Sequence, residues 1–240
     1  MTTTDGQPWC GIIVVDKPSG MSSMDVIYRV RRSASRGAGV KKTKCGHAGT
    51  LDPLATGVML CCIGKATKSV DRLMGLTKEY VADVDLSAFT TTDDREGPRR
   101  EVAVATPPAR DAIEAACAAM VGESVEQIPP AYSAIHIDGR RAYEMARQGE
   151  DVKMRPRWVR IDAIEVLAYD WPTVTIQVTC GKGTYIRSIG RDLGVGLGTG
   201  GHLSALRRTA VGRYRVEDAV PIVRFEKPLT REELLPIPAD

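Results

Sequence analysis

The chain has 240 residues, of which 43% are hydrophobic and 26% charged, and its formal net charge is +3. This balance excludes wholesale disorder and allows a buried core in one large or two small domains. So small a positive charge does not by itself indicate a nucleic acid partner.

The N-terminal part predicts a strand and then a helix. The polar residues 1–10 predict a flexible N-terminus, with no signal peptide ahead of the first apolar run. Gly11–Val15 predicts a short buried strand. Ser22 and Asp25 have the spacing of a capping box, which indicates the start of a helix. The apolar stripe of this helix is Val26, Ile27 and Val30.

The same helix and the loop after it carry charge of one sign, because there is no Asp or Glu from Val26 to Leu51. Lysine and arginine displace counterions from nucleic acid phosphates, so the stretch fits a phosphate contact. A solvated helix face with a flexible loop fits it equally well. The candidate phosphate contacts are Arg29, Arg31, Lys41, Lys42 and Lys44.

Alternating strands and helices are expected along the rest of the chain, which favours one mixed α/β domain without repeats or linkers. Strands are expected at Val58–Ile63, Tyr80–Leu86 and Val174–Cys180. Helices are expected from Thr106-Pro107 to Gly122, after the Asp138-Gly139 turn as far as Gly149, and over Tyr185–Leu193. Ser87–Arg100 is polar and turn-rich, and residues 221–240 predict a short C-terminal tail.

The six cysteines show no CxxC pair and no metal-ligand spacing. Cys61 and Cys62 lie in an apolar run, as reduced core thiols do. No segment approaches the length needed to span a membrane. A reducing cytoplasm is the simplest expectation for the location.

The segment richest in candidate chemistry is GHAGTLDPLATG, residues 46–57. Its glycines let backbone approach a ligand closely, and Pro53 stiffens the chain after Asp52. The alternative is a simple turn in which Asp52 binds backbone amides.

This segment resembles the signature loop of the TruB family of pseudouridine synthases, GHxGTLDPxATG. Five more pieces of the family's pattern occur in the same order, and together they cover roughly residues 11–220. They are Asp16–Ser23, Lys78–Tyr80, Ile128–Ala134, Gly181–Arg187 and Leu206–Arg208.

The resemblance implies an α+β pseudouridine synthase fold, with a mixed, largely antiparallel sheet flanked by helices, over residues 11–220. It implies isomerisation of uridine-55 in the T loop of tRNA to pseudouridine, a reaction that needs no cofactor and no metal. The expected partner is the T arm of tRNA. A monomer with no membrane attachment and no obligatory protein partner is the default expectation.

The resemblance also implies a role for individual residues. Asp52 matches the essential carboxylate, Arg187 its ion-pair partner, and Tyr80 a tyrosine that stacks on the target base and takes part in proton transfer. His47 matches a histidine that fills the stack vacated by the flipped nucleotide. The other expected substrate or RNA contacts are Lys17 near the pocket entrance, Tyr185 in the pocket, Leu206 beside the uracil, and Lys182 in the KGTYIR motif. His136 and His202 have no motif support.

Two departures from the family pattern stand out. Near Thr91 an acidic residue is missing or displaced to Asp93, which concerns the local loop more than the chemistry. Many members continue into a C-terminal RNA-binding PUA domain, and this chain ends at Asp240, too soon for one. The catalytic domain is therefore expected either to bind tRNA alone or to be part of a truncated chain.

Two other function classes share some of these sequence features. A nucleotide-cofactor enzyme would use the GxGxxG at residues 196–201, or Gly181–Thr184 as a phosphate loop. The first follows a predicted helix instead of a strand, and the second lacks its first glycine. A non-catalytic RNA-binding or folding module would not need Asp52, Tyr80 and Arg187 together. A guide-RNA-dependent relative is disfavoured because such forms carry an additional domain.

Overall fold

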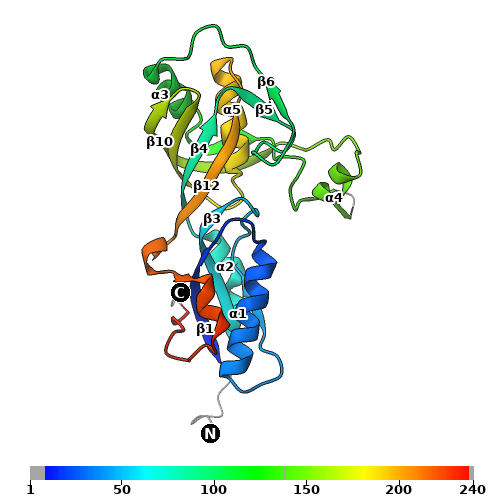
Figure 1. Ribbon diagram of the computed structural model, residues 1–240, viewed down its shortest axis with the longest axis vertical. Coiled ribbons are helices and arrows are strands. Elements are labelled where there is room, and N and C mark those ends of the chain that lie inside the picture. Colours follow the sequence, from blue (N-terminus) through cyan, green and yellow to red (C-terminus); the bar gives the residue numbers. More distant parts are fainter. Residues whose placement is uncertain (1–8, 138, 238–240) are drawn as a thin grey trace. The chain divides into compact units, whose positions relative to one another are not determined.

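The computed structural model describes residues 9–137 and 139–237, and the chain divides into two compact units where the sequence predicted one domain (Figure 1). Unit 1 comprises Met1–Lys78 and Arg207–Asp240, and unit 2 comprises Glu79–Leu206. Residues 1–8 of the predicted flexible N-terminus lie outside the described residues. Cys10, the last residue of that prediction, already belongs to the first strand.

Unit 1 is built on a sheet whose centre is β3 (Thr56–Gly64). Strand β1 (Cys10–Lys17) runs antiparallel to β3, with Ile13 opposite Cys61. On its other side β3 pairs antiparallel with β2 (Cys45–His47) and parallel with the Arg207–Arg208 part of β12 (His202–Val211). The edge strands are β13 (Tyr214–Arg215) and β14 (Val220–Pro221).

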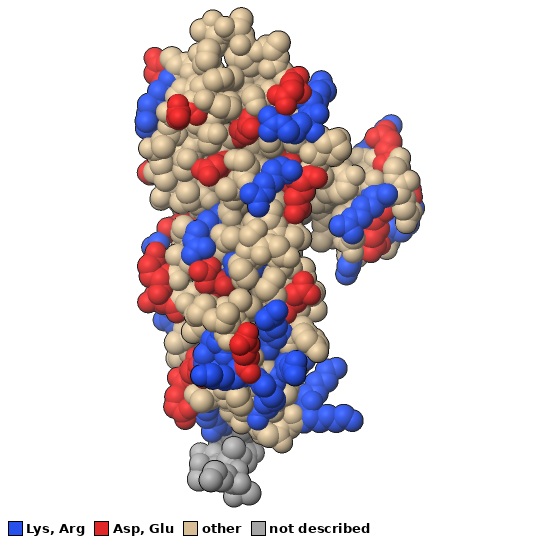
Figure 2. Space-filling model, in the orientation of Figure 1, with Lys and Arg blue, Asp and Glu red and all other residues tan. Residues whose placement is uncertain are grey.

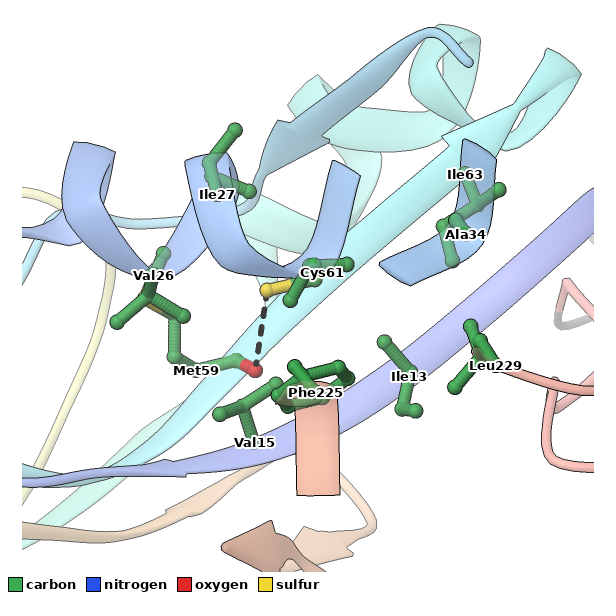
Figure 3. Close-up of a cluster of buried hydrophobic side chains, with 11 residues drawn as sticks. Ile13, Val15, Val26, Ile27, Ala34, Met59, Cys61, Ile63, Phe225 and Leu229 are labelled. Atoms are coloured by element: carbon green, nitrogen blue, oxygen red, sulfur yellow. Dashed lines mark hydrogen bonds between the residues drawn. The ribbon is translucent and has the colours of Figure 1, made fainter. Parts of the chain in front are cut away.

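The predicted helix is α1 (Ser23–Gly37), and the capping box of Ser22 and Asp25 is confirmed. Its buried residues, Val26, Ile27 and Val30 among them, pack on β1 and β3 in the core shown in Figure 3. Burying such a stripe is what stabilises a surface helix in water. The other face of the sheet is covered by η1 (Lys65–Ser69) and α2 (Val70–Gly75), which contribute Ala66 and Leu73 to a second core cluster.

Much of the segment predicted to be a C-terminal tail packs into unit 1. After η2 (Val216–Asp218), the helical turn η3 (Ile222–Glu226) places Phe225 in the core beside α1, and Leu229 joins it (Figure 3). Leu235 forms a β-bridge with Ile12. Scattered apolar residues between prolines have no periodicity, so the sequence did not reveal this packing.

Unit 2 contains the strand order β12-β4-β11-β10-β7. The predicted strands are β4 (Lys78–Asp85) and β11 (Thr173–Cys180), and both alternate in burial as expected. Strands β7 (Gly122–Gln127) and β10 (Arg157–Asp170) run antiparallel to each other and were not predicted. Exposed and charged residues interrupt the alternation in both.

Helices α3 (Arg110–Ala119) and α5 (Ile186–Leu197) pack against each other in unit 2, and α3 also contacts β10. Helix α3 begins three residues after Pro107, with Ala109 as its N-cap. The turn-rich segment contains the hairpin of β5 (Ala88–Thr90) and β6 (Arg99–Glu101). A second hairpin, β8 (His136–Ile137) and β9 (Arg140–Arg141), precedes α4 (Ala142–Arg147). Asp138 of the predicted turn lies outside the described residues.

The predicted α+β class, with a mixed and mostly antiparallel arrangement of strands and flanking helices, is confirmed. Cys61 and Cys62 are buried free thiols, as expected. Within residues 9–137 and 139–237, no helix is both long and apolar enough to cross a membrane.

Candidate active site

Asp52 lies on the loop between β2 and β3, residues 48–55, which we call the Asp52 loop. Its carboxylate is half-buried, and the amide of Ala55 donates to the carbonyl of Asp52 at 3.1 Å, closing a turn around Pro53. The loop leads into Gly57, whose φ is 101° and where a Cβ would lie 2.1 Å from the carbonyl oxygen of Arg208. Only glycine fits there, so the signature glycine has a packing reason.

Lys17 fixes the Asp52 loop from one side. It was predicted near the pocket entrance, but its side chain is fully buried. Its ammonium donates to the carbonyls of Pro18 at 2.9 Å, Met21 at 2.6 Å and Pro53 at 3.2 Å. A buried ammonium is costly unless its donors are satisfied, so this contact points to a positioning role for Lys17.

Two further side chains hold the loop. The Ser23 hydroxyl, in the first turn of α1, donates to the carbonyl of Leu51 at 3.0 Å and accepts from its amide at 2.9 Å. The buried guanidinium of Arg208 donates to the carbonyls of Val58 at 2.7 Å and Gly49 at 3.1 Å. Sequence reasoning assigned neither residue a role, although Arg208 lies in one of the quoted motifs. The loop is thus tied to α1, β1 and β12.

His47 ends β2 and is half-buried beside the same guanidinium. Burial, and then the positive charge of Arg208, lower its pKa. Its Nδ1 atom is buried with no hydrogen-bond partner among the described residues. The imidazole is therefore neutral at pH 7.

Unit 2 contains a second acidic loop, residues 90–97, which we call the Asp94 loop. The Asp94 carboxylate is buried, lies 3.4 Å from Nη1 of Arg187, and accepts from Thr92 Oγ1 at 2.6 Å and from the Glu96 amide at 3.0 Å. Arg187, in the first turn of α5, also donates to the carbonyls of Thr92 and Tyr132, each at 2.9 Å. This arginine therefore joins two segments of unit 2.

One helical turn later, Arg191 repeats the pattern. Its Nη1 donates to the Asp93 carboxylate at 2.8 Å, and its Nη2 donates to the carbonyl of Ile128, also at 2.8 Å. Asp93 has φ 58°, the one positive value that a non-glycine residue adopts in the described chain. Burial raises the pKa of Asp93, against the opposing effects of Arg191 and Arg187. Asp93, the residue near the departure from the family pattern, thus pairs with Arg191 of α5.

The remaining predicted residues of unit 2 lie on β4, β12 and the turn before α5. Tyr80 and Leu206 are each 8% exposed. Tyr185 is half-buried, and its backbone is held by Gln127, whose amide side chain accepts from the Tyr185 N–H at 2.8 Å and donates to its carbonyl at 3.1 Å. Lys182 is exposed.

The predicted phosphate contacts gather over α1 and the segment that follows it (Figure 2). Four of them are exposed and Arg31 is half-buried. The outer face of α1 also exposes Met24 at 58% and Tyr28 at 61%. A basic surface with an exposed aromatic side chain fits nucleic acid.

Two glycines of the GxGxxG motif, Gly198 and Gly201, have a structural explanation. Gly198 is the C-cap of α5, in the left-handed conformation. A Cβ at Gly201 would lie 2.3 Å from the carbonyl oxygen of Gly190. A dinucleotide fingerprint would instead open a helix after a strand, so this motif does not support a nucleotide-cofactor enzyme. The described residues contain no group of three or more His, Cys, Asp or Glu side chains that could hold a metal ion.

Comparison with known proteins identifies the family. The model of the TruB family pseudouridylate synthase N-terminal domain matches residues 37–186, and that of the tRNA pseudouridylate synthase B C-terminal domain matches residues 187–235. The tRNA pseudouridine synthase B of Phocaeicola vulgatus is 44% identical over 226 residues, covering 93% of this chain and 94% of the relative. That of Mycobacterium sp. (strain KMS) is 47% identical over 216 residues, covering 88% and 70%.

A solved structure, that of a Cbf5-Nop10-Gar1 complex, contains a chain that is 30% identical with a TM-score of 0.65. The match covers 88% of this chain and 52% of that one, so this chain spans about half of it. The fold is therefore that of the pseudouridine synthases, as predicted. Since the two family models together match residues 37–235, from the end of α1 to the C-terminal turns, the chain belongs to the TruB family of pseudouridylate synthases.

Proposed function

We propose that this chain converts uridine-55 in the T loop of tRNA to pseudouridine, with Asp52 as the catalytic carboxylate. Relatives named tRNA pseudouridine synthase B support a tRNA uridine as the substrate, and one of them aligns over 94% of its length. The observation that carries the assignment of Asp52 is its position on a loop fixed by Lys17, Ser23 and Arg208. A carboxylate placed this firmly meets the geometric demand of catalysis at a sugar carbon.

The reaction is an isomerisation within one nucleotide. The N1–C1′ bond breaks, the uracil turns, and a bond forms between C5 and C1′. C5 then loses a proton and N1 gains one, so the composition is unchanged. An ionised Asp52 attacks C1′ or stabilises positive charge on the sugar. In this proposal Arg187 keeps the carboxylate ionised, in addition to its contact with Asp94.

The other predicted residues receive roles within the same proposal. Tyr80 stacks on the target base and takes part in removing the C5 proton, and Tyr185 and Leu206 border the uracil. His47 fills the stack that the extruded base leaves, a role that suits a neutral imidazole. Extruding a base costs a few kcal/mol, which stacking on a protein ring partly offsets.

Affinity for RNA rests in part on the basic residues of α1 and its following loop. Replacing Arg29, Arg31, Lys41, Lys42 or Lys44 singly by Gln is expected to weaken binding to any RNA sequence. Each change should reduce the slope of log Kd against log salt by about 0.7 to 0.9. Unchanged slopes would remove these residues from the interface. Lys182 is proposed as a further RNA contact.

The test is tritium release from a T-arm stem-loop that carries 5-tritiated uridine at the position of uridine-55. Wild-type protein should release the label and leave pseudouridine at that position. A matched RNA with the label on another loop uridine should release none. Equal release from both RNAs would contradict the proposed position, and no release from either would contradict the activity. Monomeric action and a cytoplasmic location stay predictions.

A further inference from the structure

Arg157, at the start of β10, is an arginine whose charge the protein leaves incompletely satisfied. Its guanidinium carbon lies 4.4 Å from the centroid of the Tyr185 ring, in a cation–π contact. Its Nε and Nη2 atoms are buried and have no hydrogen-bond partner within residues 9–137 and 139–237. Buried donors of a charged group that stay unpaired destabilise the folded protein.

Other well-buried arginines of the chain show what a structural arginine does. Arg208 donates to two carbonyls, and Arg187 donates to two carbonyls beside the Asp94 carboxylate. The next strand arginine, Arg160, lies 3.1 Å from Asp162. For Arg157, burial lowers the pKa of the guanidinium, and the opposing interaction with Tyr185 is smaller. Among the described residues Arg157 therefore lacks the carbonyl and carboxylate partners that Arg208 and Arg187 have, and its guanidinium interacts with Tyr185 instead.

The guanidinium lies directly beneath an exposed glycine. Gly183 has φ 86°, and the atoms nearest to a Cβ built there are Cζ and Nη2 of Arg157 at 3.8 Å and Nη1 at 4.0 Å. A group at the position of that Cβ would therefore be in van der Waals contact with the guanidinium. The turn itself is fixed on β10, because the Gly181 amide donates to the Arg160 carbonyl at 2.9 Å and the Thr184 hydroxyl donates to it at 3.3 Å.

The rest of this turn is also positive. Lys182 is exposed next to Gly183. Helix α5 starts at Ile186, its N-cap Tyr185 makes no side-chain cap bond, and its first turn has no acidic residue. The amide groups and the dipole at such an end favour an anion. A planar guanidinium with two free N–H groups is suited to bind phosphate with a fork of hydrogen bonds.

We infer that Arg157, Lys182 and the backbone of the Gly183 turn form a binding site for one RNA phosphate at the start of α5. The inference rests on the proposed function, because the phosphate belongs to the RNA that carries the target uridine. Tyr185 holds the guanidinium in place by stacking, so the site is organised before RNA arrives. Binding of a phosphate satisfies the buried donors of Arg157.

The test compares Arg157→Gln and Arg157→Lys with wild type in binding a T-arm stem-loop at several salt concentrations. The Gln variant should bind at least about tenfold more weakly, with a slope reduced by about 0.7 to 0.9. The Lys variant should keep the slope but lose affinity, because it keeps the charge and loses the fork. Arg110→Gln is the matched control, since this exposed arginine is already paired with Glu114 at 2.7 Å.

A scan of the RNA with neutral methylphosphonates then locates the phosphate. Replacing one phosphate should weaken RNA binding by wild type but should not weaken RNA binding by Arg157→Gln any further. A merely structural arginine would not produce this coupling. If both Arg157 variants bind with the affinity and salt slope of wild type, and wild type forms pseudouridine normally, the phosphate site is overturned but the proposed function is not. Failure of wild type to bind or modify the stem-loop would overturn the proposed function, and this site with it.

Discussion

The Asp52 loop of unit 1 and the Asp94 loop of unit 2 each carry a carboxylate and are held by buried or half-buried cations, but the acceptors of those cations differ. Lys17 and Arg208 donate to backbone carbonyls around Asp52. Arg187 and Arg191 instead lie against the carboxylates of the Asp94 loop itself. The hydrogen bonds of the Asp52 loop fix the backbone that carries the acid, whereas those of the Asp94 loop engage acidic side chains directly, in addition to the carbonyl of Thr92.

Because the acceptors differ, the stability of the two loops should respond differently to pH and to substitutions. A backbone carbonyl does not titrate near neutral pH, so anchoring through carbonyls is insensitive to pH. An ion pair weakens when its carboxylate is protonated, and an unpartnered buried charge is costly. The Asp52 loop should therefore fail when a cation is removed, whereas the Asp94 loop depends also on the negative charge of Asp94.

The largest expected effect is that of Arg187→Gln. It leaves the buried Asp94 carboxylate without its ion-pair partner, and breaking such a pair costs about 3–5 kcal/mol of unfolding free energy. Urea unfolding measures this loss, and Arg110→Gln, on the exposed face of α3, should change stability by less than about 1 kcal/mol. Equal losses in the two variants would show that the pair does not hold the loop.

Lys17→Met tests the carbonyl-anchored loop. The change keeps an unbranched side chain but leaves three carbonyls without their donor, so we expect a loss of about 3 kcal/mol. The loss should be the same at pH 6 and pH 8, because the acceptors do not titrate. Lys42→Met, at an exposed position, is the control. A loss confined to one pH would mean that a titrating partner of Lys17 carries the effect.

A smaller effect is expected from Asp93→Asn. Because the folded-state pKa of Asp93 is raised above its usual value of 3.8, its contribution to stability is present below pH 3.8 and is lost as the pH rises through the folded-state pKa. The variant lacks this dependence, so its stability relative to wild type should increase across that window and then level off. Unfolding curves from pH 3 upward test the sign. A relative stability that decreases with pH would mean that the ion pair with Arg191 outweighs burial.

The smallest effect concerns His47. Its folded-state pKa is lowered below 6.5, so stability is lost as the pH falls from the unfolded-state value through the folded one. His47→Gln should remove the decrease in unfolding free energy that protonation of His47 causes at low pH, and should leave the stability between pH 7 and pH 8 unchanged. NMR titration of the imidazole, assigned with the same variant, gives the pKa directly. A value above 6.5 would contradict the burial argument.

Local signals predicted helices α1, α3, α4 and α5 and strands β1, β3, β4 and β11. The capping box and stripe of α1 and the alternation of β4 and β11 depend on residues close in sequence, and they were found. Strand β10 was missed because charged residues interrupt its pattern. The packing of Phe225 on α1 joins residues about two hundred positions apart, which no local period can indicate.

The candidate site was predicted from its motifs, but its supporting residues were not. Asp52 and Tyr80 lie in quoted motifs. Arg208 does too, yet its role depends on the carbonyl of Gly49, which only the fold brings within reach. The resemblance gave Lys17 a place near the pocket entrance, with a solvated turn lysine as the alternative, and its burial among three carbonyls contradicts only the solvated alternative.

The most direct test of the central claim is single-turnover formation of pseudouridine in the T-arm stem-loop by wild type and by Asp52→Asn. The account predicts that the variant folds, binds the RNA with an affinity within about twofold of wild type, and forms no pseudouridine above background. Product formed by the Asn variant at the wild-type rate would contradict the assignment of this carboxylate to the chemistry.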